Sequence, residues 1–113
     1  MHSRHRLRKN EQFQEIFQSG QSFANRYLVL YYKAQVIPGD FRVGISVSKK
    51  VGNAVTRNRV KRLMKAVIAE LSPYISSGVD LVFIARPRVV ELDFLQMKQN
   101  IIHVCKNSGL YRG

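Results

Sequence analysis

Hydrophobic side chains recur at helical spacing in three segments of the chain, which predicts helices over residues 10–19, 53–71 and 93–106. Asn53 and Asp93 stand where N-caps are expected for the second and third helices. The three apolar stripes consist of Phe13, Ile16 and Phe17; of Val60, Leu63, Met64, Val67, Ile68 and Leu71; and of Phe94, Leu95, Ile101, Ile102, Val104 and Cys105. Each helix is therefore expected to bury one face against a common core.

Alternating or continuous apolar runs predict strands between these helices. Residues 23–35 read as one long strand, and residues 41–48 as a second strand that pairs with it as a hairpin through the turn at 38–40. Residues 79–86 are apolar on both faces, which predicts a central strand. In the long strand, alternation places Leu28, Leu30 and Tyr32 on one face and Phe23, Asn25, Tyr27, Val29, Tyr31 and Lys33 on the other.

The predicted order α-β-β-(β)-α-β-α indicates an α+β (α/β) protein in which helices pack on a mixed, mainly antiparallel sheet of about four strands. The 113 residues fit a single domain. We expect a flexible basic arm over 1–9, the folded region over 10–107 and a short tail over 108–113.

The charge balance changes this ordinary picture. The chain holds 19 Lys and Arg against seven Asp and Glu, a formal net charge of +12. Such an excess favours a polyanionic partner, with nucleic acid as the leading class and an anionic membrane or an acidic protein as alternatives.

The cations concentrate in one segment, KKVGNAVTRNRVKR at residues 49–62, and no carboxylate stands between Asp40 and Glu70. Arg57, Lys61 and Lys65 lie at i, i+4 spacing, where like charges repel each other on a helix. A segment that accepts this repulsion is expected to meet phosphates, aided by the N–H groups of the helix N-terminus. The alternative is a solvated charged face.

Aromatic residues offer a second candidate. Phe13, Phe17, Tyr27 and Tyr31 either pack together as core or form a stacking floor for single-stranded RNA, with phosphates held by Lys33 and Arg26.

Several classes are disfavoured by what the sequence lacks. Cys105 is the sole cysteine, so neither an intrachain disulfide nor a Cys-based zinc site is expected. There is no HExxH, Walker or nucleophile-elbow motif, and no apolar run approaches the roughly 20 residues of a membrane span. We expect a cytoplasmic protein with no catalytic set of its own.

The segment RVGISVSKKVGNAVTRNRVKRL, residues 42–63, resembles the signature of the bacterial ribonuclease P protein component. LRKNEQFQEIF at 7–17, ANRYLVLYY at 24–32 and VFIAR at 82–86 also resemble that family, so the likeness covers nearly the whole chain. The resemblance implies a two-layer sandwich with a left-handed β-α-β crossover. It also implies the protein subunit of an endoribonuclease whose RNA subunit uses Mg²⁺ to remove the 5′ leader of precursor tRNA.

The resemblance implies two RNA sites and no catalytic residue in the protein. No metal ligand is predicted from the residues, and whether protein groups bind Mg²⁺ stays open. Contact with the catalytic RNA is expected at Lys49, Lys50, Asn53, Arg57, Asn58, Arg59, Lys61, Arg62 and Lys65. Contact with the leader is expected at Phe13, Phe17, Tyr31, Lys33 and Arg26, with arm contacts at Arg6 and Arg8. Tyr27 stays open between cleft and core.

The expected partners are the ribonuclease P RNA and precursor tRNA, without a membrane or an obligate protein partner. A structural RNA-binding protein of the ribosomal type is the alternative function. A stand-alone nuclease is a third possibility, and a DNA-binding protein is the weakest because no helix-turn-helix spacing occurs.

Overall fold

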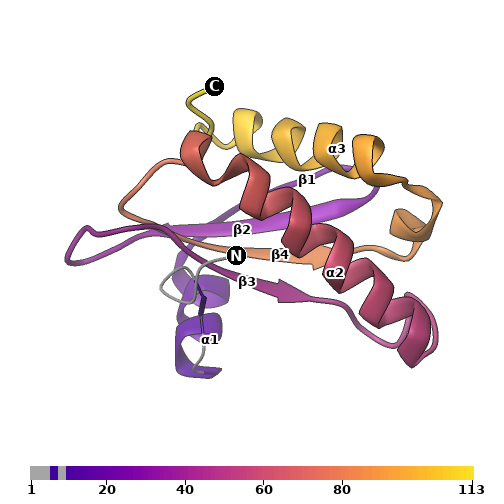
Figure 1. Cartoon of the computed structure of the whole chain (residues 1–113). Helices are drawn as coiled ribbons and strands as arrows, with labels where there is room; N and C mark the ends of the chain where they lie inside the picture. Colours follow the sequence, from indigo (N-terminus) through magenta and orange to yellow (C-terminus); the bar gives the residue numbers. More distant parts are fainter. Residues whose placement is uncertain (1–5, 8–9) are drawn as a thin grey trace.

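The computed structural model describes residues 6–7 and 10–113 of the 113-residue chain. Within these residues the chain forms three α-helices, four strands and two short 3₁₀ helices (Figure 1). The helices are α1 (Asn10–Ser19), α2 (Ala54–Leu71) and α3 (Phe94–Asn107), and the strands are β1 (Gln21–Ala24), β2 (Leu28–Ala34), β3 (Arg42–Ser46) and β4 (Val79–Ala85). The 3₁₀ helices are η2 (Ser72–Tyr74) and η3 (Pro87–Glu91). The α+β class and the three predicted helices are confirmed.

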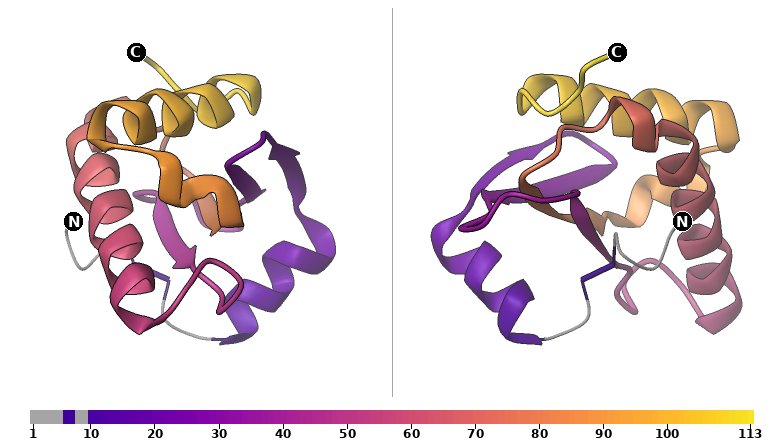
Figure 2. Two further views of the ribbon diagram at one scale, coloured as in Figure 1. Left: turned by 90° about the vertical axis from the view of Figure 1, so that its right-hand side faces the viewer. Right: turned by 60° about the vertical axis from the view of Figure 1, so that its left-hand side comes forward.

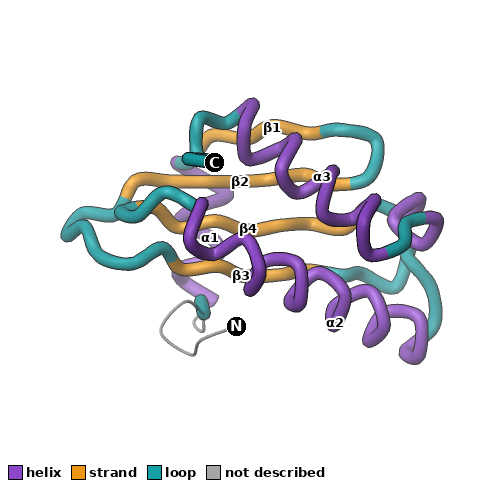
Figure 3. The backbone as a smooth tube through the Cα atoms, turned by 45° about the horizontal axis from the view of Figure 1, so that its top comes forward, coloured by secondary structure: helices purple, strands orange, loops and turns teal. Residues whose placement is uncertain are grey.

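The four strands form one mixed sheet in the order β1-β2-β4-β3 (Figure 3). β2 pairs antiparallel with both β1 and β4, whereas β3 pairs parallel with β4. The predicted hairpin between the second and third strands is therefore wrong, because β4 lies between them. β4 has apolar residues on both faces, with Val82 and Phe83 fully buried, and only a central position covers both faces.

The predicted long strand is divided by a turn at Asn25. Its side-chain Oδ1 accepts hydrogen bonds from the backbone N–H groups of Tyr27 and Leu28, both at 2.9 Å. This Asx turn folds β1 back onto β2, so that Phe23 lies opposite Leu30 and shares its face. Phe23 and Tyr27 consequently pack against the core beneath α2 and α3, which corrects the face predicted for both residues.

The helices lie on the two faces of the sheet (Figure 2). α2 and α3 cover one face and bury the large core with Leu30, Leu81 and Phe83 of the strands. α1 packs on part of the opposite face, where Ile16 meets Val82 in a small second cluster. The sheet thus separates a fully covered face from one that is only partly covered.

The connection from β3 through α2 to β4 is left-handed. In Figure 1 both strands point to the right, α2 lies in front of the sheet, and β4 lies above β3. The crossover implied by the family resemblance is confirmed, and it departs from the usual right-handed rule.

The predicted caps are present at both long helices. Asn53 Oδ1 accepts from Thr56 N–H at the start of α2, and Asp93 forms a capping box with Gln96 at the start of α3. The predicted stripe of α3 is partly wrong, because Leu95 is 60% exposed and Phe94 41% exposed. The buried stripe is Met97, Ile101, Val104 and Cys105. Leu95 falls outside this stripe, and Phe94 is the first residue of the helix.

Candidate nucleic-acid interface

The loop between β3 and α2 presents its lysines to solvent. Ser48 organises the loop by accepting hydrogen bonds from Lys50 N–H at its Oγ, 3.3 Å away, and from Val51 N–H at its carbonyl, 3.1 Å away. Val51 is buried and anchors the loop to the core, while Lys49 and Lys50 remain exposed. The loop therefore holds two cations beside the N-terminus of α2.

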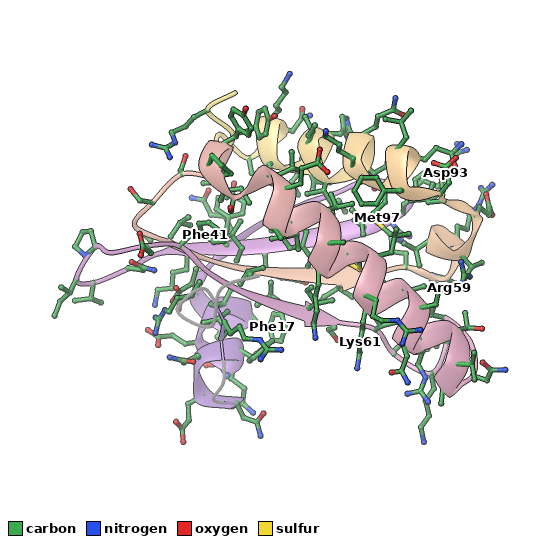
Figure 4. All side chains as sticks on the ribbon, viewed as in Figure 1. Phe17, Phe41, Arg59, Lys61, Asp93 and Met97 are labelled. Atoms are coloured by element: carbon green, nitrogen blue, oxygen red, sulfur yellow. The ribbon has the colours of Figure 1, made fainter. Side chains whose placement is uncertain are left out.

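The remaining cations of the segment lie on α2 itself. The buried stripe of α2 turns its polar residues outward, so Asn58, Arg59 and Arg62 are exposed and Arg57, Lys61 and Lys65 half-buried. We call the set Lys49, Lys50, Asn53, Arg57, Asn58, Arg59, Lys61, Arg62 and Lys65 the basic surface. Arg59 and Lys61 lie on opposite sides of the helix axis, as helical spacing predicts (Figure 4).

Within the described part of the chain, no acidic side chain pairs with this surface. The salt bridges between described residues are Glu15–Lys33, Arg42–Asp80, Arg88–Glu91 and Lys98–Glu70. None of these pairs includes a residue of the basic surface. Its charges are therefore available to an external anion such as a phosphate.

Three aromatic side chains lie between α1 and the partly covered face of the sheet. The rings of Phe17 and Tyr31 make an edge-on contact, with centroids 5.0 Å apart and planes at 79°. Phe13 lies against Gly44 of β3, where a Cβ atom would stand only 2.4 Å from Phe13 Cζ. Phe17 is 41% exposed, while Phe13 and Tyr31 pack partly on Ile16. We call Phe13, Phe17 and Tyr31 the aromatic cleft.

A groove of about 400 Å³ lies between Phe13 of the aromatic cleft and α2 of the basic surface. Its lining residues are Arg6, Leu7, Phe13, Val43, Gly44, Ile45, Lys61 and Lys65. The two predicted sites therefore meet at this groove, where Phe13 of the aromatic cleft and two lysines of the basic surface line one cavity. Sequence reasoning did not single out Gly44, although a glycine within a strand is a known signal of close approach.

Residues of the predicted arm contribute to this groove. Leu7 N–H donates to the carbonyl of Val43 at 3.0 Å, and Arg6 forms a parallel bridge with Val43, so these two residues run beside β3. Leu7 is buried with Ile16. Arg8, the other predicted arm contact, lies outside the described residues.

The structure does not bring Lys33 and Arg26 together. Lys33 lies near α1, where its Nζ is 2.6 Å from Glu15 Oε1. Arg26 is exposed in the turn between β1 and β2, at the other end of β2. Lys33 thus lies beside α1 with its charge already paired, and Arg26 stands at the far end of β2.

Reactive or metal-binding side chains are few in the rest of the described chain. Burial raises the pKa of the Cys105 thiol to about 12. No group of three or more His, Cys, Asp and Glu side chains that could hold a metal ion occurs among the described residues. Likewise, no helix in that part of the chain has the length and apolarity to cross a membrane.

Comparisons with known proteins agree on one family. The family model described as Ribonuclease P matches residues 1–109. A Ribonuclease P protein component from Bacillus cereus (strain B4264) is 47% identical over 112 residues, which cover 99% of this chain and 97% of the relative.

Solved structures give the same result. The Staphylococcus aureus RNase P protein is 38% identical with a TM-score of 0.86, over 95% of this chain and 97% of that one. A mutant of the S. aureus protein, described as having defective mRNA degradation activity, is 37% identical with a TM-score of 0.89, over 96% of this chain and 91% of that one.

Proposed function

The chain belongs to the bacterial ribonuclease P protein family, and on that premise we propose that it binds two RNAs at once. The basic surface binds the catalytic RNA of ribonuclease P, and the aromatic cleft binds the single-stranded 5′ leader of precursor tRNA. The observation that carries this proposal is the groove shared by Phe13, Lys61 and Lys65. A leader strand in the cleft then lies next to the helix that holds the catalytic RNA.

The basic surface acts by electrostatics. Two RNA molecules that approach each other repel through their phosphates, and cations placed between them lower that repulsion. Arg57, Arg59 and Arg62 offer planar guanidinium groups that bind phosphate oxygens in pairs, whereas the lysines act as point charges. Lys61 and Lys65 face the groove, so we propose that they contact both the catalytic RNA and the leader.

The aromatic cleft acts by stacking. Exposed aromatic rings bind bases of single-stranded RNA without strict sequence preference, at roughly 1–3 kcal/mol for each base. This tolerance suits leaders of varied sequence. Phe17 offers the most open ring of the cleft, and Tyr31 supports it from the sheet.

In this proposal the RNA subunit carries out the hydrolysis. Magnesium ions held by the RNA supply the chemistry at the phosphodiester. The protein residues position the leader and screen charge, which lowers the magnesium concentration that the RNA needs. The proposed place of action is the cytoplasm, where bacteria make their precursor tRNAs.

The central experiment is reconstitution of the purified chain with a bacterial ribonuclease P RNA. Cleavage of precursor tRNA is measured across a magnesium series with RNA alone, with RNA plus protein, and with protein alone. We expect protein to restore cleavage at low magnesium. Failure to do so contradicts the proposal. Cleavage by protein alone, with an unstructured mRNA as additional substrate, would instead favour a stand-alone nuclease.

The substrate preference distinguishes the proposed function from a purely structural RNA-binding role. The reconstituted enzyme is expected to bind precursor tRNA more tightly than mature tRNA, because only the precursor has a leader for the aromatic cleft. A protein of purely structural function would give equal affinities for the two.

A further inference from the structure

An exposed cluster of two tyrosines and two cations lies where α2 ends, away from the surfaces assigned above. The C-terminal segment folds back here, because Tyr111 forms an antiparallel bridge with Ile75 and Arg112 N–H donates to Tyr74 O at 2.7 Å. The rings of Tyr74 and Tyr111 are 5.9 Å apart at an angle of 38°. We call Tyr74, Lys106, Tyr111 and Arg112 the tyrosine surface.

Tyr74 supplies the open ring of this surface. It is 47% exposed at the end of η2, directly after Pro73, which restricts the backbone there. The Tyr111 ring is more covered, since Lys106 Nζ lies 5.5 Å over its centroid and Gly113 lies at its edge. Tyr111 therefore packs beside Tyr74, and Tyr74 is the ring on which a base from solvent can stack.

The cations beside these rings are placed for phosphates. Arg112 Nη2 contacts the carbonyls of Pro73 and Ile75 at 3.2 and 3.4 Å, which fixes the guanidinium and leaves its other N–H groups for an anion. Lys106 is exposed. Glu70, the acidic residue at the end of α2, already pairs with Lys98 at 2.6 Å. The surface thus combines an open ring with two cations, the combination that binds single-stranded nucleic acid.

We propose that the tyrosine surface is a second RNA-binding site, at which unpaired nucleotides of the catalytic RNA stack on Tyr74 while Lys106 and Arg112 hold their phosphates. This inference rests on the proposed function. It adds a contact at the opposite end of α2 from Asn53, about 27 Å away along an 18-residue helix. The catalytic RNA would then be held at both ends of one rigid helix.

The catalytic RNA fits this site better than the leader does. The aromatic cleft lies on the face of the sheet that α1 partly covers, whereas η2 continues directly from α2 on the other face. A leader bound in the cleft would have to pass around the sheet to reach Tyr74. An RNA bound along α2 reaches Tyr74 on the same face of the sheet.

The test uses the full chain and measures its affinity for the ribonuclease P RNA. Tyr74→Ala is expected to weaken assembly at least about fivefold, the lower end of a single stacking contact. Tyr74→Phe keeps the ring and should assemble as the unsubstituted chain does. Phe94→Ala is the matched control, because Phe94 is a similarly exposed aromatic residue outside the proposed surfaces. Unchanged assembly of Tyr74→Ala overturns the inference.

A fluorescence measurement reports stacking directly. The chain contains no tryptophan, so Tyr74→Trp introduces a single tryptophan at the site, whose emission can be excited apart from that of the tyrosines. We expect its emission to be quenched when the catalytic RNA binds, while Phe94→Trp stays unquenched. Equal behaviour of the two variants contradicts stacking at Tyr74.

Two further comparisons separate the possible failures. If Arg59→Ala weakens assembly and Tyr74→Ala does not, the inference fails and the proposed function stands. If the unsubstituted chain does not assemble with the RNA at all, the proposed function fails. If Tyr74→Ala assembles normally but loses preference for precursor over mature tRNA, the site binds the leader and the inference as stated is wrong.

Discussion

The ring of Phe17 contacts Tyr31 yet stays 41% exposed, so removal of this ring tests RNA contact with little loss of packing. Phe17→Ala should therefore cost little folding free energy. We expect it to weaken binding of precursor tRNA to the reconstituted enzyme about tenfold and to leave mature tRNA binding unchanged, since one stacked base is worth roughly 1–3 kcal/mol. Tyr31→Ala should act in the same direction.

Phe94→Ala serves as the matched control for Phe17→Ala, because it removes a ring on α3 that is also 41% exposed. Equal losses for precursor and mature tRNA in Phe17→Ala and Tyr31→Ala would point to a packing role for these side chains.

Gly44 permits the position of Phe13. A methyl group at residue 44 would stand 2.4 Å from Phe13 Cζ, so Gly44→Ala must displace the ring. We expect the variant to fold with a lower melting temperature, at a cost of about 1–3 kcal/mol for the forced repacking. We also expect it to lose part of the preference for precursor tRNA.

Gly39→Ala is the matched glycine control, because the nearest atom to its added methyl group is 4.0 Å away. A Gly44→Ala protein with unchanged stability and unchanged leader preference would show that Phe13 does not occupy this position.

Cys105 reports on the integrity of the core. Burial raises the pKa of its thiol to about 12, so at pH 8 almost none of it is the reactive thiolate in the folded protein. We expect a thiol-specific reagent to label the native protein very slowly and the denatured protein rapidly, with one equivalent bound because the cysteine is single. Rapid labelling in native buffer would contradict the packing of α3.

At the scale of elements, Asn53 caps α2 and, in the proposed function, also contacts the catalytic RNA. Its Oδ1 caps the helix, so Asn53→Ala should lower the free energy of unfolding by about 1 kcal/mol. Asn53→Asp keeps the cap but adds a negative charge to the basic surface. We therefore expect Asn53→Asp to retain stability and to bind the catalytic RNA more weakly.

Asp93 provides the control for this prediction. It caps α3 in the same way but lies outside the basic surface. Asp93→Ala should lose a similar amount of stability without a change in RNA affinity at equal folded concentration. An Asn53→Asp protein that assembles as tightly as the unsubstituted chain would remove Asn53 from the interface.

The elements also show where sequence reasoning succeeds. Helix periodicity and capping are local, so α1, α2 and α3 could be predicted, the last two together with their N-caps. The order of the strands depends on which strand is buried on both faces. The turn at 38–40 suggested that β2 and β3 are neighbours, whereas β3 pairs with β4. The break at Asn25 is an Asx turn inside an apolar run, and missing it reversed the predicted faces of Phe23 and Tyr27.

The candidate site also has one part that the sequence predicts and one part that it does not. The basic segment could be predicted because its residues are adjacent in sequence and one helix displays them. The groove depends on Phe13, Gly44 and Lys61, which come from three elements and line one cavity. No local pattern predicts that juxtaposition, nor does one separate Arg26 from Lys33.

At the scale of the whole molecule, charge is distributed unevenly. The net charge is +12, and four carboxylates pair with cations outside the basic surface. The unpaired cations of the loop and α2 therefore dominate the field that an approaching RNA meets. Binding should then be governed by the release of counterions from the RNA.

This distribution predicts the salt dependence of assembly. The basic surface contains Lys49, Lys50, Arg57, Arg59, Lys61, Arg62 and Lys65. If most of these contact phosphates, log K for the catalytic RNA should fall linearly with log salt concentration, with a slope of about −4 to −6. Arg62→Ala should reduce the slope by about one, because one phosphate contact is lost. Arg88→Ala should leave it unchanged, since Arg88 lies outside the basic surface and pairs with Glu91. A slope near zero, or equal slopes for the Arg62 and unsubstituted proteins, would contradict phosphate binding by this surface.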